Sequence, residues 1–343
     1  MDFSTKPSKY YLGYNGLKEL SYKAVDSDEN DSYDEIIWFD YNENPIAKGI
    51  DTNNDGVIED FQSDSTKIAD YPAIQVDGNF SFSWQEATGD CWLLSAINSL
   101  ANSKGCNEIL KNSLEYQDDK VIFHTHFGDY EITTEEILIA QRAKIEKEDE
   151  EGTMFMPKYS TGDDDVLLIE LGVEKVRKDI LDGKLNISST DFTAWDAPIV
   201  KNKENPLDIG FSSELIYYLT GNRSLYTSSN LAKEMILDNF AKNHDNLSLQ
   251  GAFKEEKEIE DINGNKYYLV SEHSYTIADV NNESVTIINP NNSEKRITLK
   301  KEDFMKNSAY IVYYDAENNS NFLNKFVADI ESIWKNFKYF FTT

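Results

Sequence analysis

The chain has 343 residues, 40% of them hydrophobic and 13% aromatic, a composition that supports one or two packed domains and excludes wholesale disorder. Its 62 acidic residues outnumber its 33 basic ones, and the resulting net charge of −29 disfavours nucleic acid and anionic membranes as partners. Two cysteines, Cys91 and Cys106, are too few for a disulfide framework or a cysteine-rich zinc site.

The N-terminal segment MDFSTKPSKYYLG has neither the basic start nor the apolar stretch of a signal peptide. No apolar run approaches the roughly 18–20 residues that a membrane-spanning helix needs. We therefore expect a soluble protein, intracellular as the sequence stands. A signal peptide that had been removed would leave no trace, so an extracellular location stays open.

Residues 1–75 form an acidic leader rich in Asn and Asp. Two charged runs, DSDENDSYDE (27–36) and DTNNDGVIEDFQ (51–62), flank the aromatic segment IIWFDY (36–41). Charged runs stay solvated, whereas β-branched and aromatic residues favour strands. The leader is therefore predicted to be a small β-rich or irregular appendage.

The second acidic run has the ligand spacing of an EF-hand-like calcium loop. The candidate oxygen ligands occupy positions one, three, five, seven and nine of the loop, and they are Asp51, Asn53, Asp55, Val57 and Glu59. Gly56 takes the sharp-turn position six, but position twelve is Gln62 instead of a bidentate acid, and the flanks are poor helices. Two interpretations stay open: a structural or regulatory calcium site, and an Asn/Asp-rich surface loop.

Residues 76–222 are predicted to be predominantly helical. After a turn at VDGN (76–79), apolar residues recur at helical spacing from Cys91 towards Gly105, which is a natural stop. Three further helices are predicted, at residues 133–144, 164–181 and 210–222. The acidic run EKEDEEG (146–152) is predicted to be an exposed loop.

Residues 223–315 are predicted to be β-rich, since their second part is dense in Val, Ile and Tyr. The segments KEIEDI-NG-NKYYLV and HSYTIADV-NN-ESVTIINP are typical of hairpins with two-residue turns, and RITLKKEDFMKNSAYIVYYD suggests further strands. A helical half followed by a β half predicts an α+β fold with a cleft between the halves. The tail, residues 316–343, contains an amphipathic helix candidate (321–341) whose partner the sequence does not identify.

Cys91 is predicted to lie in the first turn of its helix. There, unpaired backbone N–H groups and the helix dipole favour negative charge, which lowers a thiol pKa and supplies the nucleophilic thiolate. Gly89 allows a tight turn, and Asp90 offers a capping carboxylate. The alternative is a small buried hydrophobe at a helix start.

A nucleophilic thiol needs an imidazole as base and a third group to hold the imidazole. Of the four histidines, His273 lies in a predicted strand whose hairpin partner carries Asn289. A two-residue turn would set Asn289 opposite Ser274, and a bulge or a slip would bring it beside His273. The other three are expected to be structural or solvated: His124, His126 and His244.

The segment QEATGDCWLLSAINSL (85–100) closely resembles the active-site segment of calpains. LVSEHSYTIADV (269–280) and IINP (287–290) are similar to the calpain histidine and asparagine segments, in the same order. VLLIELGVEKV (166–176) and LTGN (219–222) resemble other parts of the first calpain subdomain. The resemblance spans about residues 76–315.

The resemblance implies a papain-like core of two catalytic subdomains, residues 76–222 with the cysteine and 223–315 with the histidine and asparagine. It implies that Cys91 attacks a peptide carbonyl, that His273 serves as base and acid, and that Asn289 orients His273. Gln85 would complete the oxyanion hole. The chain is thus expected to be a calpain-like cysteine endopeptidase that acts on polypeptides through an acyl-enzyme and needs no cofactor for the chemistry.

The resemblance has departures. Asn291 stands where calpains carry a Trp that covers the His–Asn bond, so this bond is expected to be wetter here. The acidic calcium ligands of calpain cores do not align and are not carried over. Two alternatives stay open: a transglutaminase-like acyl transferase, disfavoured because such enzymes use Asp as the third residue, and a calcium-dependent binding protein on a degenerate peptidase scaffold.

Overall fold

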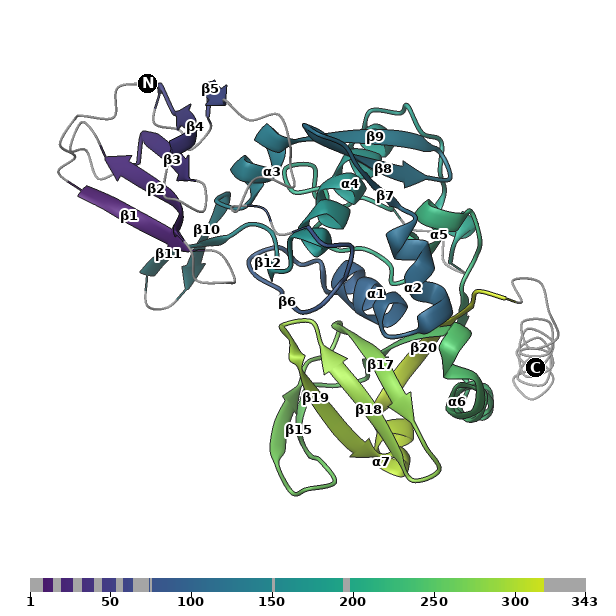
Figure 1. Cartoon of the computed structure of the whole chain (residues 1–343). Coiled ribbons are helices and arrows are strands. Elements are labelled where there is room, and N and C mark those ends of the chain that lie inside the picture. Colours follow the sequence, from purple (N-terminus) through teal and green to yellow (C-terminus); the bar gives the residue numbers. More distant parts are fainter. Residues whose placement is uncertain are drawn as a thin grey trace.

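The computed structural model describes residues 9–14, 20–26, 33–39, 45–53, 58–63, 74, 76–149, 152–193 and 198–317, with the side chains of 9–14, 20–21 and 146–155 excepted (Figure 1). The helix predicted at 321–341 lies outside the described residues. The fold is a mixed α+β arrangement with several antiparallel sheets, as the sequence predicted at that level.

The leader forms an antiparallel five-stranded sheet whose strands follow one another in sequence order. Its strands are β1 (Lys9–Tyr14), β2 (Leu20–Asp26), β3 (Glu35–Phe39), β4 (Pro45–Ile50) and β5 (Asp60–Ser63). Trp38 on β3 is fully buried and packs edge-on against Phe61 of β5. The β-rich prediction for the leader is confirmed, and its apolar residues belong to the same hydrophobic cluster as those of the next lobe.

The first lobe, residues 76–222, contains both helices and strands, so the prediction of a predominantly helical region is wrong. Its helices are α1 (Cys91–Ala101), α2 (Lys104–Lys111), α3 (Thr134–Ala140), α4 (Asp164–Leu181) and α5 (Glu214–Thr220). A three-stranded sheet of β7 (Leu114–Tyr116), β8 (Lys120–Thr125) and β9 (Gly128–Thr133) packs against them. Two small sheets add β6 (Ser83–Trp84) with β12 (Thr161–Gly162), and β10 (Lys144–Asp149) with β11 (Gly152–Pro157).

Local chemistry explains the helix boundaries in this lobe. Thr133 and Glu136 form a capping box at the start of α3, and the Asp163 side chain accepts the Asp165 N–H at the start of α4. The predicted stop at Gly105 is wrong, because α1 ends at Ala101 and Gly105 lies inside α2. The acidic run predicted as a loop instead forms the β10–β11 hairpin.

The second lobe is a six-stranded antiparallel sheet in the order β13-β20-β14-β17-β18-β19. Its strands are β13 (Leu225–Thr227), β14 (Leu247–Phe253), β17 (Ser274–Val280), β18 (Ser284–Asn289), β19 (Asn292–Lys300) and β20 (Ser308–Asp315). A separate hairpin pairs β15 (Lys257–Glu260) with β16 (Lys266–Leu269). Helices α6 (Asn230–Asn243) and α7 (Lys301–Asn307), which the sequence analysis did not predict, lie at this sheet (Figure 1).

Both predicted hairpins exist, but their turns are longer than two residues. Residues 281–283 connect β17 and β18, and a bulge interrupts the ladder between Ile277 and Asp279. Thr276 therefore pairs with Ile288, so Asn289 is not in register with Ser274. The turn between β15 and β16 spans residues 261–265, with Gly264 at a φ of 82° that suits glycine.

The two lobes meet at α1. This helix contacts β17 and β14 of the second lobe, and in Figure 1 it lies directly over that sheet. A second hydrophobic cluster, built from residues between 236 and 313, fills the second lobe. The helix that begins with Cys91 thus runs along the boundary between two cores.

Candidate active site

Cys91 is the first residue of α1 and is partly exposed, whereas the following residues are buried. The next residue, Trp92, donates from Nε1 to the Leu207 carbonyl at 3.0 Å and packs under the Arg177 guanidinium at 4.3 Å. Both partners belong to the first lobe, so Trp92 holds the helix start within that lobe.

The prediction of a lowered thiol pKa is wrong for Cys91 in this structure. Burial raises the pKa of the Cys91 thiol to about 11, and the nearby carboxylates of Asp90 and Asp208 act in the same direction. Hydrogen bonds from the backbone N–H groups of Ser274 and Trp92 lower the pKa, but by less than burial raises it. The helix start alone therefore does not supply a thiolate.

His273 precedes β17 and is only 9% exposed. Its Nε2 lies 2.8 Å from Asn289 Oδ1, the contact that the sequence analysis expected. Burial lowers the pKa of His273, and the bond to Asn289 opposes this shift. The N–H of Ser274, the residue that directly follows His273, donates to the Cys91 sulfur. The thiol therefore lies next to the backbone that carries the imidazole.

The His273–Asn289 bond is partly buried, since His273 is buried and Asn289 is partly exposed, so the expected wetness of this bond stays a prediction. Asn291, in the position of the calpain Trp, donates its backbone N–H to Asn289 Oδ1 at 3.0 Å, which fixes the amide from the other side. The Tyr275 ring lies edge-on to the imidazole, with ring centroids 4.9 Å apart. Tyr275 thus contributes to covering the imidazole without the missing Trp.

Gln85 links the two lobes through its backbone. Its backbone N–H donates to the Pro290 carbonyl at 2.9 Å, next to Asn289. Its side-chain Nε2 donates to the Thr88 carbonyl at 2.8 Å, which leaves a second amide hydrogen for a ligand. Because Cys91 opens the helix, its N–H has no acceptor inside α1. These two donors are the ones that an oxyanion hole would use.

Two buried carboxyl groups, those of Asp90 and Glu170, lie next to the start of α1. The predicted cap is wrong, since the Asp90 side chain makes no capping bond and instead lies against the Glu170 carboxyl of α4. Glu170 also accepts the Ser160 N–H at 3.1 Å and the Ser160 hydroxyl. Burial and the neighbouring carboxylate raise the pKa of Asp90, and burial raises the pKa of Glu170. Two buried carboxyls in contact cannot both ionise cheaply, so they share a proton.

The backbone is strained on both sides of the site. Ile209, at φ 61°, and Glu272, at φ 54°, are the only non-glycine residues in the described part of the chain with positive φ. Ile209 donates its N–H to the Gly89 carbonyl at 3.0 Å, two residues before Cys91, and Glu272 directly precedes His273. Both side chains are exposed. Burial of these side chains therefore does not explain the strained backbone at either residue.

The calcium-loop candidates connect β4 and β5, so strands and not helices flank them. Among the described candidates, Glu59 binds Thr52 and Asn53, and the Asn53 N–H donates to Asp51 at 3.3 Å. Asp55 and Val57 lie outside the described residues. Within the residues that the structure describes, no cluster of three or more His, Cys, Asp or Glu side chains could hold a metal.

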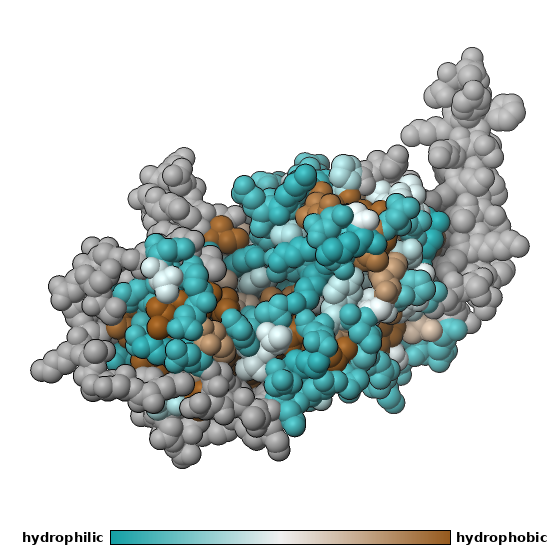
Figure 2. All heavy atoms as spheres, turned by 90° about the horizontal axis from the view of Figure 1, so that it is seen from above, coloured by the Kyte–Doolittle hydropathy of each residue, from teal (hydrophilic) through white to brown (hydrophobic). Residues whose placement is uncertain are grey.

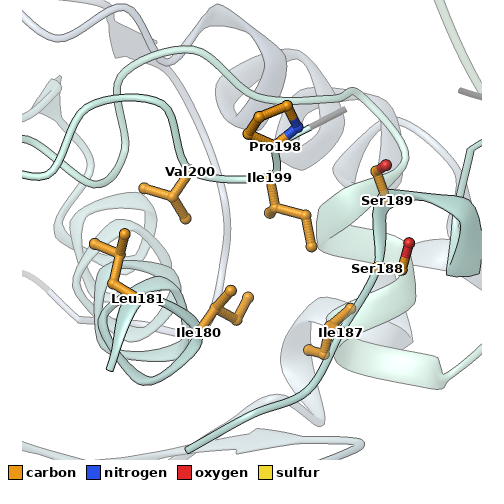
Figure 3. A pocket seen from close by; sticks show the side chains of 8 residues that line it. All are labelled: Ile180, Leu181, Ile187, Ser188, Ser189, Pro198, Ile199 and Val200. Atoms are coloured by element: carbon orange, nitrogen blue, oxygen red, sulfur yellow. The ribbon is translucent and has the colours of Figure 1, made fainter. Parts of the chain in front are cut away.

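An open groove of about 630 Å³ lies at the C-terminal end of α4, between that end and residues 187–189 and 198–200 (Figure 3). Its walls are mainly aliphatic, with Ile180, Ile187 and Ile199 facing one another. It contains none of the predicted site residues.

Hydrophilic side chains dominate the face of the molecule shown in Figure 2. No helix in the described part of the chain is long and apolar enough to cross a membrane. No protein-family model matches the chain, and a search of curated proteins found no match.

Proposed function

We propose that the protein is a calpain-like cysteine endopeptidase built on a papain-like core. The observation that carries the proposal is the convergence of three elements: a thiol at the start of α1, an N–H from Ser274 that donates to it, and the 2.8 Å contact between His273 and Asn289. The residues come from different lobes and lie up to 198 positions apart, so the fold and not the local sequence assembles them.

The polarity of the His273–Asn289 bond assigns the proton positions. An amide oxygen can only accept, so His273 Nε2 donates and Nδ1 carries the free lone pair. Nδ1 would take the proton of the Cys91 thiol as the sulfur attacks a peptide carbonyl, and it would pass this proton to the departing amine. A water, deprotonated by the same nitrogen, would then hydrolyse the thioester.

The developing oxyanion would accept hydrogen bonds from the Cys91 N–H and the second Gln85 amide hydrogen. The loss of one such donor costs about 2.7–4 kcal/mol in well-studied hydrolases. Since the Gln85 backbone N–H is bonded to Pro290, this donor is held by the residue that directly follows Asn289. The oxyanion site and the base would therefore stay aligned.

The test is the turnover of casein, an unstructured polypeptide, by the wild-type protein and by Cys91→Ala, with Cys106→Ala as the matched thiol control. We expect new peptide N-termini with wild type and Cys106→Ala and none with Cys91→Ala. Parallel reactions contain calcium or a chelator, and a labelled primary amine. Incorporation of the amine without hydrolysis would identify an acyl transferase, and no turnover under any condition would favour a binding protein.

A further inference from the structure

The side of α1 that faces the second lobe is polar. Ser95, Ser99 and Asn102 recur at the spacing of one helix face. Ser95 Oγ lies 2.6 Å from Ser274 Oγ, Ser99 Oγ lies 2.6 Å from Ser248 Oγ, and Asn102 donates to the Ala278 carbonyl at 2.6 Å. Buried hydrogen bonds therefore join this helix to the second lobe.

Ser274 has two hydroxyl neighbours from the first lobe. Besides Ser95, the Ser212 hydroxyl lies 2.9 Å from the Ser274 hydroxyl. All three side chains are buried, with exposed fractions of 0%, 4% and 6% for Ser95, Ser274 and Ser212. Thr276, two residues along β17, donates to the Ser95 carbonyl at 2.7 Å and fixes the same contact from the backbone side.

The carbonyl of Trp92 indicates which hydroxyl donates to which in the chain of Ser212, Ser274 and Ser95. Ser95 Oγ lies 3.2 Å from the carbonyl of Trp92, which can only accept, so the Ser95 hydrogen points there. With the Ser95 hydrogen on that carbonyl, Ser95 accepts from Ser274, and Ser274 accepts from Ser212. Tyr310 hydrogen-bonds to Ser212 and lies at the far end of this chain. The order Ser212, Ser274, Ser95, Trp92 uses one hydrogen per hydroxyl and ends beside Cys91.

We propose that Ser274 is a positioning residue for the nucleophile: its hydroxyl, held between Ser212 and Ser95, keeps its backbone N–H against the Cys91 sulfur. The residue thus acts on Cys91 through its main chain while its side chain is fixed by the first lobe. This role rests on the proposed peptidase function, in which negative charge develops on that sulfur. A correctly held N–H stabilises the charge as it forms.

The chain offers a matched control. The Ser99–Ser248 pair has the same O–O distance as the Ser95–Ser274 pair, it is buried to the same degree, and it joins the same helix to the same sheet. It lies one turn further from Cys91 and is bonded to the Leu249 carbonyl. Ser99→Ala should therefore weaken the contact between the lobes without disturbing the nucleophile.

The experiment measures Cys91 alkylation by iodoacetamide as a function of pH, by peptide mapping, in wild type, Ser274→Ala, Ser95→Ala, Ser212→Ala and Ser99→Ala. We expect Ser274→Ala to slow alkylation near pH 8 about three- to tenfold, the value of one ordinary hydrogen bond. Ser95→Ala and Ser212→Ala should slow it less, and Ser99→Ala should leave it unchanged. In peptide cleavage, kcat should fall with the alkylation rate while KM stays constant.

Thermal unfolding of every variant shows whether slower alkylation comes from a displaced Ser274 N–H or from a general loss of folding stability. Equal slowing by Ser99→Ala and Ser274→Ala, or no slowing by Ser274→Ala, would overturn the proposal and leave the hydroxyls as contacts between the lobes. If Ser274→Ala fails to fold, Ser95→Ala and Ser212→Ala still test the chain without altering Ser274. Alkylation needs no peptidase activity, so its result stands even if the wild-type protein cleaves nothing.

Discussion

At the scale of single residues, the thiol and the imidazole are both shifted towards their neutral forms. Burial raises the pKa of Cys91 to about 11 and lowers that of His273. A neutral pair differs from a preformed thiolate–imidazolium pair, because the proton must move during the attack. The free protein should therefore contain little thiolate at neutral pH.

The alkylation of Cys91 should report this state directly. Its rate with iodoacetamide should keep rising with pH above 9, as expected for a thiol with a pKa of about 11. Cys106 has a similarly raised pKa but is fully buried, so it should react more slowly at every pH. A rate plateau between pH 5 and 8 would show that a thiolate–imidazolium pair exists in the free protein.

Asn289 should contribute less to turnover than His273. Asn289→Ala removes one orienting hydrogen bond to an imidazole that burial and Tyr275 already confine, and we expect kcat to fall about 10- to 100-fold. His273→Ala removes the base itself and should cost about 10²- to 10⁴-fold. Steady-state kinetics of both variants make the comparison. Equal losses would mean that the bond to Asn289, and not the packing around the imidazole, holds the ring in place.

The Asp90–Glu170 pair should make stability depend on pH. A carboxyl whose pKa is raised in the folded state keeps a proton that the unfolded chain has released, so stability falls as pH rises between the two pKa values. Asp90→Asn places a permanent N–H donor opposite Glu170 and should flatten this dependence. Melting temperatures from pH 4 to 9 test it, and a variant as pH-dependent as wild type would contradict the shared proton.

At the scale of elements, the sequence predicted those helices and strands whose bounds are set by local residues. α4 was predicted with its observed bounds, because its apolar period and the Asp163 cap coincide. The register between β17 and β18 could not be predicted, since a three-residue connection and a bulge after Ile277 shift the pairing of the two strands. The β10–β11 hairpin was missed because its acidic residues indicate solvation and not pairing. Small buried hydroxyls such as Ser274 carry no signature, although the Ser95–Ser99 spacing on α1 was visible.

We predict that the connection between β4 and β5 binds calcium weakly. A loop flanked by strands and lacking a bidentate residue at position twelve should bind weakly, with a Kd of roughly 10⁻⁴–10⁻³ M. Calcium at about ten times that Kd would stabilise the fold by about 1.4 kcal/mol. Thermal unfolding with calcium, with magnesium and with a chelator should show a rise that the Asp51→Ala, Asp55→Ala double variant lacks. A rise that persists in this variant would place any calcium elsewhere.

At the scale of the whole molecule, the site exists only while the lobes stay together. Besides the α1 contacts, the Ser83 N–H donates to the Ser293 hydroxyl at 2.7 Å, and Gln85 is bonded to Pro290. The four predicted site residues are therefore distributed over two lobes that these hydrogen bonds help to join.

The net charge of −29 should select among substrates. An acidic molecule attracts basic polypeptides at long range, and this attraction is screened over about 8 Å at physiological salt. We expect kcat/KM for an unstructured basic polypeptide to exceed that for an acidic one of similar length at low salt. The ratio should approach one at high salt. A ratio independent of salt would show that local contacts alone determine the preference.

The left-handed backbone at Ile209 and Glu272 limits how stable this protein can become without a change next to its candidate site. A non-glycine residue in that conformation costs about 1–3 kcal/mol, and glycine would adopt it freely. Random mutagenesis that selects only for thermal tolerance should therefore enrich glycine at these two positions. Such variants would lose the exposed aliphatic side chain of Ile209, whose backbone N–H is bonded to Gly89 near the thiol, and the exposed carboxylate of Glu272, which directly precedes His273. We therefore expect the gain in stability at these positions to come with a change in substrate selectivity.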